Sequence, residues 1–591
     1  MWTKWPFVSS LGEINVKDLS FRYAEAKTNV LSNINLSIEP GEFVLVMGPS
    51  GCGKSTLFLH ANGVIPQLVE GKLSGKVTVS GIDTQTSSVS ELARHVGMVF
   101  QDPEIQLFAL TVEEELAMVL ENLGVAPGEI RKRVDWAISL AKLDGMQQRA
   151  PMELSAGEKQ RVATAAMLTL GPEIMIFDEP TAYLDFPNTQ VILNAVRDMC
   201  TDLKKTTVLI EHKIETVLKF VDRVVVLNAD GTLYHDGDPK QVFSHVEELE
   251  EIGLRVPIAI RMAYMLAKAE PKFQFLKEDL PLTVDDLATV MSARRIIKTR
   301  PPPMKHAVGE GKSGCSSTPA VRVENLSYKY PATRKEVLSG INLTIDKGQY
   351  VALLGAGGSG KSVLAKHFIG LVNPSEGSVF VNGKDVASLS VGELARMVGY
   401  LFQNPDHQIF NATVYDELAY GPRNVGTDEK ETRGRIERVL ELTKLEGLEQ
   451  RDPESLSMGQ RLRLALGSVL VMDPSIIVLD EPTIGQDPGH LRPIMDLVYS
   501  LNREEGKTVI LITHHTDLAL EYCDRVIVMA DGKILTDGSY YEVFRQGALL
   551  ERCGVNQPAI ARLMNLLFGE EAPLPRTVDD AVNIIRECIW E

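Results

Sequence analysis

The sequence predicts an α/β protein built from two similar domains in tandem, each with a helical subdomain and each followed by a small helical extension. Three observations predict this: a glycine-rich segment occurs twice, later landmarks recur in the same order, and 591 residues are enough for several domains. Gln101 and Gln403 are 302 positions apart (403 − 101), and three further pairs share that spacing: Ser155 and Ser457, Glu179 and Glu481, and His212 and His514. An internal repeat of this length fixes the architecture before any element is assigned.

Composition limits the class of protein. The formal net charge of −18 argues against broad binding to nucleic acid, and no nucleic-acid partner is expected. The six cysteines contain no CxxC pair, which fits a reduced compartment and offers no zinc or iron–sulfur site. The N-terminus lacks a signal-peptide pattern, and no apolar run approaches the roughly 18–20 residues that span a bilayer. We therefore expect any role at a membrane to be exercised through a partner.

The elements of each domain follow from apolar patterning. The runs Ile14–Phe21, Asn33–Ile38 and Glu42–Met47 predict strands, and a helix is expected to begin at Lys54. The second domain repeats this pattern from Val321 to Ser362. Five extra residues of the first domain fall near Val64–Gly75, a turn-rich stretch in which we expect a surface loop.

Each domain is followed by a repeated tail. Thr283 and Thr577 both precede two aspartates and an apolar run, a pattern typical of a helix N-cap with acids in the first turn. A stretch rich in proline, glycine and serine separates the two halves and predicts a flexible linker. The predicted segments are residues 12–245 (first domain), 246–297 (helical extension), 298–319 (linker), 320–547 (second domain) and 548–591 (helical extension).

The glycine-rich segments match the pattern GxxxxGK[ST], which wraps a phosphate in backbone N–H groups at a helix N-terminus. The lysines Lys54 and Lys361 neutralise phosphate charge, and the serines Ser55 and Ser362 can ligate Mg²⁺. The predicted nucleotide-binding residues are Gly48, Pro49, Ser50, Gly51, Cys52, Gly53, Lys54, Ser55 and Thr56 in the first copy, and Gly355, Ala356, Gly357, Gly358, Ser359, Gly360, Lys361, Ser362 and Val363 in the second.

Downstream, two apolar runs each end in a pair of acids. The first run ends at Asp178 and Glu179, and the second at Asp480 and Glu481. An aspartate at the end of a buried strand can hold Mg²⁺ through water, and the next glutamate can polarise an attacking water. Both halves thus predict a phosphate-cleaving site that uses Mg²⁺.

The segments Leu154–Glu158 and Leu456–Gln460 resemble the LSGGQ signature of ATP-binding cassette (ABC) ATPases, and the order of landmarks is that family's order. The resemblance implies two P-loop NTPase domains of the ABC type that pair head to tail and enclose two ATP molecules. Each phosphate loop would face the signature of the other cassette, so that Lys54 shares its ATP with Ser457, and Lys361 with Ser155. Gly157 and Gly459 would complete the signature contacts.

The resemblance also implies further roles. Gln101 and Gln403 would contact Mg²⁺, as would Ser55, Ser362, Asp178 and Asp480. His212 and His514 would contact the γ-phosphate, and Glu179 and Glu481 would act on the attacking water. Tyr23 and Tyr330 would stack on adenine, and Asp185 and Asp487 would lie in loops at the cassette interface. Because both glutamates are retained, we expect two hydrolysis-competent sites, with rates made unequal by the differences Ala156/Met458 and Thr56/Val363.

The segments after the two glutamines, Phe100–Phe108 and Phe402–Phe410, look like those of energy-coupling-factor (ECF) importers and their cobalt and nickel relatives. This resemblance implies a peripheral subunit at the cytoplasmic face of the membrane. It would bind the coupling helices of a transmembrane scaffold protein, which carries a separate substrate-capturing membrane protein. The cargo stays open among a vitamin, a related small molecule and a transition-metal ion.

The competing interpretation is a soluble tandem ABC ATPase that acts on ribosomes. Such proteins carry a strongly basic linker, whereas residues 240–318 contain 12 Lys and Arg against 10 Asp and Glu. A nearly balanced charge weakens binding through counterion release. The sequence therefore favours transport.

Overall fold

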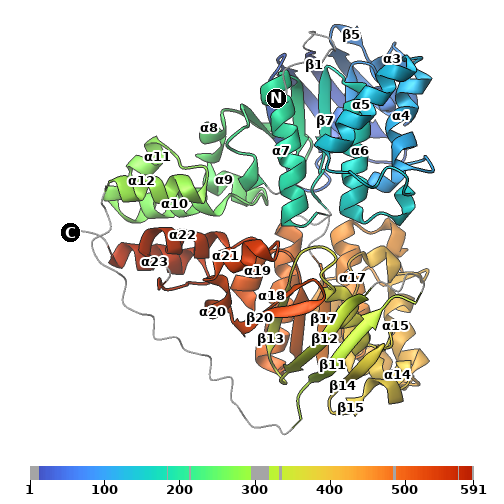
Figure 1. The fold of residues 1–591 in the computed structure, drawn as a ribbon, viewed down its shortest axis with the longest axis vertical. Helices are drawn as coiled ribbons and strands as arrows, with labels where there is room; N and C mark the ends of the chain where they lie inside the picture. Colours follow the sequence, from blue (N-terminus) through green and yellow to red (C-terminus); the bar gives the residue numbers. More distant parts are fainter. Residues whose placement is uncertain are drawn as a thin grey trace. The chain divides into compact units, whose positions relative to one another are not determined.

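The computed structural model describes residues 12–182, 184–211, 214–294, 318–331, 336–482, 488–569 and 571–588. The chain divides into two compact units, Met1–Leu287 and Ala288–Glu591. Each unit is an α/β domain followed by short helices (Figure 1). Most of the predicted linker 298–319 lies outside the described residues, as do His212 and Asp487. The five predicted segments are finer than this two-unit division and stay predictions.

The first unit contains two sheets. An antiparallel sheet has the order β2-β1-β4-β5, with β1 Ile14–Tyr23, β2 Leu31–Ile38, β4 Gly71–Val79 and β5 Ile82–Asp83. The second sheet has the order β10-β9-β3-β8-β7-β6, with β3 Phe43–Met47, β6 Val96–Val99, β7 Ile174–Asp178, β8 Thr206–Ile210, β9 Arg223–Leu227 and β10 Leu233–Gly237. Only its edge strand β10 is antiparallel. Strands β3, β7 and β8 are buried at every residue, as expected for a parallel sheet covered on both faces.

The helices of the first unit form separate groups. Helix α1 (Lys54–Ala61) packs with the two sheets in one core. Helices α4 (Val112–Asn122), α5 (Pro127–Leu140) and α6 (Ala156–Leu170) share a second core and form the predicted helical subdomain. The remaining helices are α2 Val64–Gln67, α3 Val89–Leu92, α7 Phe186–Leu203, α8 Pro239–Phe243, α9 Val246–Glu251, α10 Ile258–Ala269, α11 Phe275–Glu278 and α12 Val284–Ala293, with short 3₁₀ turns η1 Pro103–Ile105, η2 Pro151–Glu153, η3 Ile214–Thr216 and η4 Pro271–Phe273.

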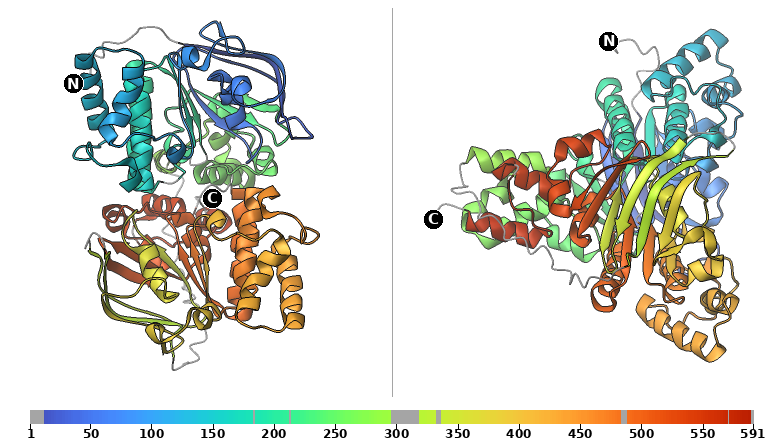
Figure 2. Two further views of the ribbon diagram at one scale, coloured as in Figure 1. Left: turned by 90° about the vertical axis from the view of Figure 1, so that its right-hand side faces the viewer. Right: turned by 60° about the horizontal axis from the view of Figure 1, so that its bottom comes forward.

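The strands of the second unit repeat this plan. Its antiparallel sheet has the order β12-β11-β14-β15, and Figures 1 and 2 show β11, β12 and β14 side by side in a curved layer. Its second sheet has the order β16-β17-β18-β13-β19-β20, which matches the first unit strand for strand. The strands are β11 Val321–Lys329, β12 Glu336–Ile345, β13 Tyr350–Leu354, β14 Glu376–Val381, β15 Lys384–Asp385, β16 Val398–Leu401, β17 Ile476–Asp480, β18 Thr508–Ile512, β19 Arg525–Ala530 and β20 Lys533–Ser539.

The helices of the second unit complete the repeat. Helices α15 to α17 again share a core of their own, apart from the core around the sheets. The elements are α13 Lys361–Phe368, α14 Val391–Ala395, α15 Val414–Asn424, α16 Glu429–Thr443, α17 Met458–Leu470, α18 Pro488–Glu505, α19 Thr516–Tyr522, α20 Tyr540–Phe544, α21 Gly547–Arg552, α22 Ala559–Phe568 and α23 Val578–Glu587, with 3₁₀ turns η5 Val386–Ser388, η6 Pro405–His407 and η7 Pro453–Ser455. The predicted fold of two α/β domains with helical subdomains is confirmed.

The extra residues of the first unit do not form the surface loop that the sequence predicts. The stretch Val64–Gly75 forms α2 and the first half of β4. Strand β4 pairs with β1 as far as Tyr23 opposite Gly71, whereas β14 begins only at Glu376. The prediction is wrong because part of this stretch forms backbone hydrogen bonds with β1. That pairing depends on a distant strand, and the turn-rich composition of the stretch does not indicate it.

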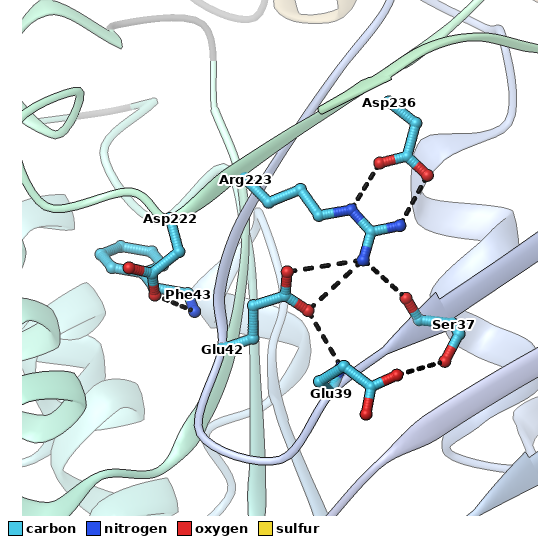
Figure 3. A network of polar contacts seen from close by, with 7 residues as sticks. All are labelled: Ser37, Glu39, Glu42, Phe43, Asp222, Arg223 and Asp236. Carbon is cyan, nitrogen blue, oxygen red and sulfur yellow. Dashed lines mark hydrogen bonds and ion pairs between the residues drawn. The ribbon is translucent and has the colours of Figure 1, made fainter. Parts of the chain in front are cut away.

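An arginine network fastens the two sheets of the first unit together (Figure 3). Arg223 at the start of β9 donates to both carboxylate oxygens of Asp236 on β10 and, at 2.9 Å, to the carbonyl oxygen of Ser37 on β2. Arg525 repeats this arrangement in the second unit, where it pairs with Asp537 and donates to the carbonyl oxygen of Thr344 at 2.8 Å. A bidentate pair of this kind fixes geometry as well as adding energy.

The tails begin as their sequences predict. The Thr577 hydroxyl accepts the N–H of Asp580 at the start of α23, and the Thr283 hydroxyl accepts the N–H of Asp286 at 3.2 Å at the start of α12. Among the described residues, no helix has both the length and the apolar character needed to cross a membrane.

A buried histidine makes the first unit sensitive to acid. His60 on α1 is 1% exposed, its Nδ1 lies 2.8 Å from the carbonyl oxygen of Thr56, and burial lowers its pKa to about 4. The unfolded chain, with a histidine pKa near 6.5, therefore binds this proton first, and stability falls as the pH drops below about 6.5.

We expect His60→Leu to remove a share of this acid sensitivity on the order of 2 kcal/mol at pH 5. Denaturant titrations at pH 5 and pH 7 give the loss of unfolding free energy between the two pH values. His407→Leu, at an exposed histidine, is the control. If both variants lost the same unfolding free energy between pH 7 and pH 5, the role of His60 would be contradicted.

Candidate functional site

In the first unit the glycine-rich segment joins the end of β3 to the start of α1. Gly53 has φ of +98°, and a Cβ there would lie 2.7 Å from the Leu31 side chain, so the position requires glycine. No side chain caps the N-terminus of α1, whose N–H groups and dipole favour an anion. Lys54 is 6% exposed and donates to the carbonyl oxygens of Gly48 (2.8 Å) and Pro49 (3.1 Å). Its ammonium is therefore held at the loop predicted to bind phosphate.

The second unit builds the same loop between β13 and α13. Gly360 has φ of +100°, and again no side chain caps the helix. Lys361 is 8% exposed and donates to the carbonyl oxygens of Gly355 (2.8 Å) and Ala356 (2.9 Å). It also lies 3.3 Å from the hydroxyl of Ser359, the residue that takes the place of Cys52. Both predicted loops thus have one geometry.

The strand-end aspartates lie next to these loops. Asp178 ends β7 and Asp480 ends β17, and both are buried. In the first unit, β8 lies between β7 and β3, the strand that precedes the glycine-rich segment. In the second unit, β18 lies between β17 and β13 in the same way. Ser362 donates to Asp480 Oδ1 at 2.9 Å, which places the two predicted Mg²⁺ ligands of the second unit together.

The glutamates that follow share one backbone conformation, and Gln101 contacts the first of them whereas Gln403 is exposed. Glu179 and Glu481 both adopt a left-handed backbone, with φ of 46° and 49°, and each backbone N–H donates across to the neighbouring strand. Gln101 donates to Glu179 Oε2 at 2.8 Å. His514 Nδ1 lies 2.9 Å from Glu481 Oε2. Burial would raise the pKa of Glu481, but the interactions with His514 and Lys361 hold that pKa below its ordinary value.

The second unit has a contact at its aspartate that sequence reasoning missed. The Tyr400 hydroxyl on β16 donates to Asp480 Oδ2, so that both carboxylate oxygens accept a hydroxyl. The residue at the matching position of the first unit is Met98, whose sulfur accepts an N–H from Asn62 at 3.2 Å. Burial raises the pKa of Asp480, and the Tyr400 and Ser362 hydroxyls offset part of that rise. The signal in the sequence is a tyrosine in a buried strand run, which normally reads as packing alone.

Tyr400→Phe tests what this contact contributes. The variant keeps the ring but leaves one oxygen of a buried carboxylate without its donor, so we expect the second unit to lose about 1–3 kcal/mol of unfolding free energy. Hydrogen exchange of the β17 amides at increasing denaturant measures the loss in that unit alone. Met98→Leu, a swap of similar volume in the first unit, should cost less. Equal losses for the two variants would show that the hydroxyl contributes nothing.

The predicted signature serines are helix caps. Ser155 caps α6 in a capping box with Glu158, and Ser457 caps α17 in a capping box with Gln460. Glu158 accepts the Ser155 N–H at 2.8 Å, and Gln460 accepts the Ser457 N–H at 2.9 Å. The exchange of glutamine for glutamate between the copies therefore leaves the cap intact.

The predicted adenine-stacking tyrosines differ in their surroundings. Tyr23 is partly buried, and its hydroxyl lies 2.9 Å from that of Thr56 in the phosphate loop. Tyr330 is 45% exposed, and the residue corresponding to Thr56 is Val363. The difference Thr56/Val363 thus decides whether this tyrosine is tied to the loop.

Other predicted residues are placed less fully. Gln403 is exposed, unlike its counterpart Gln101. Gly459 is buried at the start of α17, and Asp185 caps α7 by accepting the Asn188 N–H. The predicted sharing of ATP between Lys54 and Ser457, and between Lys361 and Ser155, involves both units and stays a prediction.

The residues present fit a nucleotide with Mg²⁺. Each unit offers an uncapped helix N-terminus, a buried lysine ammonium beside it and a buried aspartate at a strand end. Within the described part of the chain, no cluster of three or more His, Cys, Asp or Glu could hold a metal ion by itself. Mg²⁺ characteristically uses one or two carboxylates together with phosphates and water, so this donor set suits it.

Comparison with known proteins agrees with this geometry. The ABC transporter family model matches residues 31–182 and 338–484, the same part of each unit. A relative from Methanosarcina mazei, provisionally named ABC transporter ATP-binding protein, is 39% identical over 97% of both chains. One from Caldanaerobacter subterraneus subsp. tengcongensis with the same provisional name is 40% identical over 94% of this chain and 96% of its own.

Two solved structures of single proteins each cover less than half of this chain. The structure of cbiO1 from Clostridium perfringens, part of the ABC transporter complex cbiONQ, is 36% identical, covers 42% of this chain and 99% of its own, and has a TM-score of 0.37. ABC ATPases bind ATP with Mg²⁺ and hydrolyse it, and the family model matches both halves here. The chain belongs to the ABC transporter family as an ATP-binding protein with two cassettes, and it is an ATPase.

Proposed function

We propose that this chain is the ATP-binding and ATP-hydrolysing subunit of an ECF-type importer at the cytoplasmic face of the cell membrane. Its cargo is a vitamin, a related small molecule or a transition-metal ion. Two ATP molecules lie at the interface of the two cassettes. The coupling helices of a transmembrane scaffold dock on the segments after Gln101 and Gln403, and a substrate-capturing membrane protein is engaged through that scaffold.

The residue roles in this proposal are those the sequence predicts. Mg²⁺, when bound, neutralises phosphate charge and orients the phosphates. Ser55, Gln101 and Asp178 hold it in the first cassette, and Ser362, Gln403 and Asp480 in the second. Glu179 and Glu481 polarise the attacking water, and His212 and His514 contact the γ-phosphate. The buried aspartate at the strand end that precedes each glutamate supports these roles, as does the buried lysine of each predicted phosphate loop.

The observation that carries the docking proposal is exposed apolar surface after each glutamine, made by three large side chains in the first unit and by one in the second. In the first unit Ile105, Phe108 and Leu110 are 61%, 73% and 80% exposed, and in the second unit Phe410 is 65% exposed. Large apolar side chains gathered in one exposed segment mark an interaction surface. The segments carry acids, such as Glu104 and Asp406, rather than the basic residues that ribosomal RNA would require.

An ion pair joins each docking segment to the signature helix. Lys159 on α6 pairs with Glu104 in the first unit, and Arg461 on α17 lies 3.0 Å from Asp406 in the second. Lys159 and Arg461 follow the signature serines Ser155 and Ser457 by four residues. A shift of a docked partner therefore has a direct path to the signature. ATP binding favours the closed cassette pair, and this differential affinity shifts the population of the coupled membrane partner.

Purification from membranes in mild detergent tests the proposal. A transmembrane scaffold that co-purifies with the chain supports it, and a capture protein in the same complex would name the cargo. Phe108→Asp combined with Phe410→Asp should release the scaffold, because each places a charge on the docking surface. Leu535→Asp is a matched control, since Leu535 is 50% exposed on β20, at the opposite edge of the second unit's sheet from β16.

The outcome that would overturn the proposal is co-sedimentation with ribosomes together with no recovery in the membrane fraction. Release of the scaffold by Leu535→Asp to the same extent as by the paired variant would instead remove the docking surface from the proposal. Both results are read from the same fractions by mass spectrometry.

A further inference from the structure

We propose that Glu115 and Glu417 are positioning residues that hold the two docking segments in a preformed shape for their membrane partner. This inference rests on the proposed function, since it assigns the docking surface a rigid support. Glu115 lies in α4 and Glu417 at the matching place in α15, 302 positions later (417 − 115). Each is only 3% exposed.

Both carboxylates accept backbone N–H groups from the segment that displays the exposed aromatic ring. Glu115 Oε2 accepts the N–H groups of Phe108 and Ala109, each at 2.7 Å. Glu417 Oε2 accepts those of Phe410 at 3.1 Å and Asn411 at 2.9 Å. The side-chain amide of Asn411 adds a further bond of 2.9 Å to the same oxygen. One buried oxygen thus fixes two consecutive peptide groups in each unit.

A buried carboxylate is costly unless its charge is satisfied. Across the described residues neither Glu115 nor Glu417 forms an ion pair with lysine or arginine, so the N–H groups of the segment supply the compensation together with the nearby N-terminus of the helix. Hydrogen bonds to a charged acceptor are stronger than those to a neutral one. If the segment loosened, the buried carboxylate would lose these hydrogen bonds and its burial would become costly. This cost keeps the segment in place.

The anchored segment points its aromatic ring outward. Leu107 and Ile409, the residues just before the anchored rings, pack against the cores of the helical subdomains, whereas Phe108 and Phe410 are mostly exposed. Phe410 also meets Tyr420 edge to face at 4.8 Å between ring centroids. A partner that binds such a surface does not have to order it first, which lowers the entropic cost of docking.

The test compares three variants of the first unit: Glu115→Leu, which removes the acceptor; Glu115→Gln, which keeps a neutral one; and Glu121→Gln, a control on the exposed end of the same helix. Hydrogen exchange of the Phe108 and Ala109 amides reports the anchor. Recovery of the membrane scaffold reports docking. Basal ATP turnover and melting temperature report whether the fold and the nucleotide sites survive. The second unit is tested in parallel with Glu417→Leu and Glu417→Gln.

We expect Glu115→Leu to speed exchange of both amides by about tenfold or more and to weaken scaffold binding by about tenfold, with basal turnover unchanged. Glu115→Gln should give an intermediate effect on both, and Glu121→Gln none. Because Gln keeps the volume and an acceptor, it remains informative even where Leu fails to fold.

Two results overturn the inference. Unchanged exchange would show that the anchor does not hold the segment. Faster exchange with undiminished scaffold binding would show that the anchor serves the fold and not docking. If the wild-type chain itself recovers no membrane scaffold, the proposed function is overturned. The wild-type sample therefore distinguishes failure of the proposed function from failure of this inference.

Discussion

Glu179→Gln and Glu481→Gln are each expected to stop hydrolysis at their own site, by about 10²-fold or more, while ATP still binds. Loss of a positioned proton acceptor typically costs this much, and the change from glutamate to glutamine alters neither volume nor backbone. Both residues follow a buried strand that ends in aspartate, and the backbone N–H of each is fixed at 2.9 Å to a carbonyl oxygen of the neighbouring strand. The amide should therefore occupy the place of the carboxylate.

The double variant gives the larger effect and the cleaner measurement. We expect it to show almost no turnover and to retain two ATP molecules per chain, counted after rapid removal of free nucleotide. The single variants should differ, because Gln101 donates to Glu179 whereas the corresponding Gln403 is exposed. Glu173→Gln, at the opposite end of strand β7 from Glu179, is the control and should hydrolyse normally. If each single variant kept wild-type turnover, the assignment of the catalytic glutamates would be wrong.

Most of the fold could be predicted because the chain repeats itself. Periodic apolar runs, a glycine at a left-handed position before Lys54 and two acids at a strand end are local signals. Each has one common structural solution. Parallel strands then bring their carboxyl ends to the same edge, so residues more than a hundred positions apart, such as Ser362 and Asp480, meet without any further signal.

What the sequence did not predict depends on the register between elements. Tyr400 reaches Asp480 because β16 and β17 pair with Tyr400 opposite Val478, which no local pattern specifies. Glu115 lies among the acids at the start of α4 and looks like an ordinary solvated residue. Its burial follows only from the way the preceding segment folds back over the helix. The difference in exposure between Gln101 and Gln403 is likewise invisible in two nearly identical motifs.

The second large effect is expected from the proposed pairing of each phosphate loop with the signature of the other cassette. Ser457→Asp should lower the affinity for ATP at the site of Lys54 by about 10³-fold, because it places a carboxylate against a phosphate. The repulsion between two such charges roughly 4 Å apart near a protein surface is about 4 kcal/mol. The helix itself should survive, since aspartate caps as well as serine does and Gln460 carries no charge. Ser457→Asn is the matched control: it also caps the helix and is neutral.

Combination with the phosphate-loop lysines decides which cassette the serine serves. If Ser457 completes the site of Lys54, the variants Lys54→Ala and Ser457→Asp disable one and the same site. The double variant Lys54→Ala with Ser457→Asp should then still bind one ATP per chain. Lys361→Ala with Ser457→Asp should bind none, because it disables both sites. Effects on one shared site do not add, whereas effects on two separate sites do, so counting bound nucleotide by equilibrium dialysis distinguishes the arrangements. The reverse pattern, with one ATP retained by Lys361→Ala with Ser457→Asp and none by Lys54→Ala with Ser457→Asp, would place Ser457 at the phosphate loop of its own cassette and end the head-to-tail assignment.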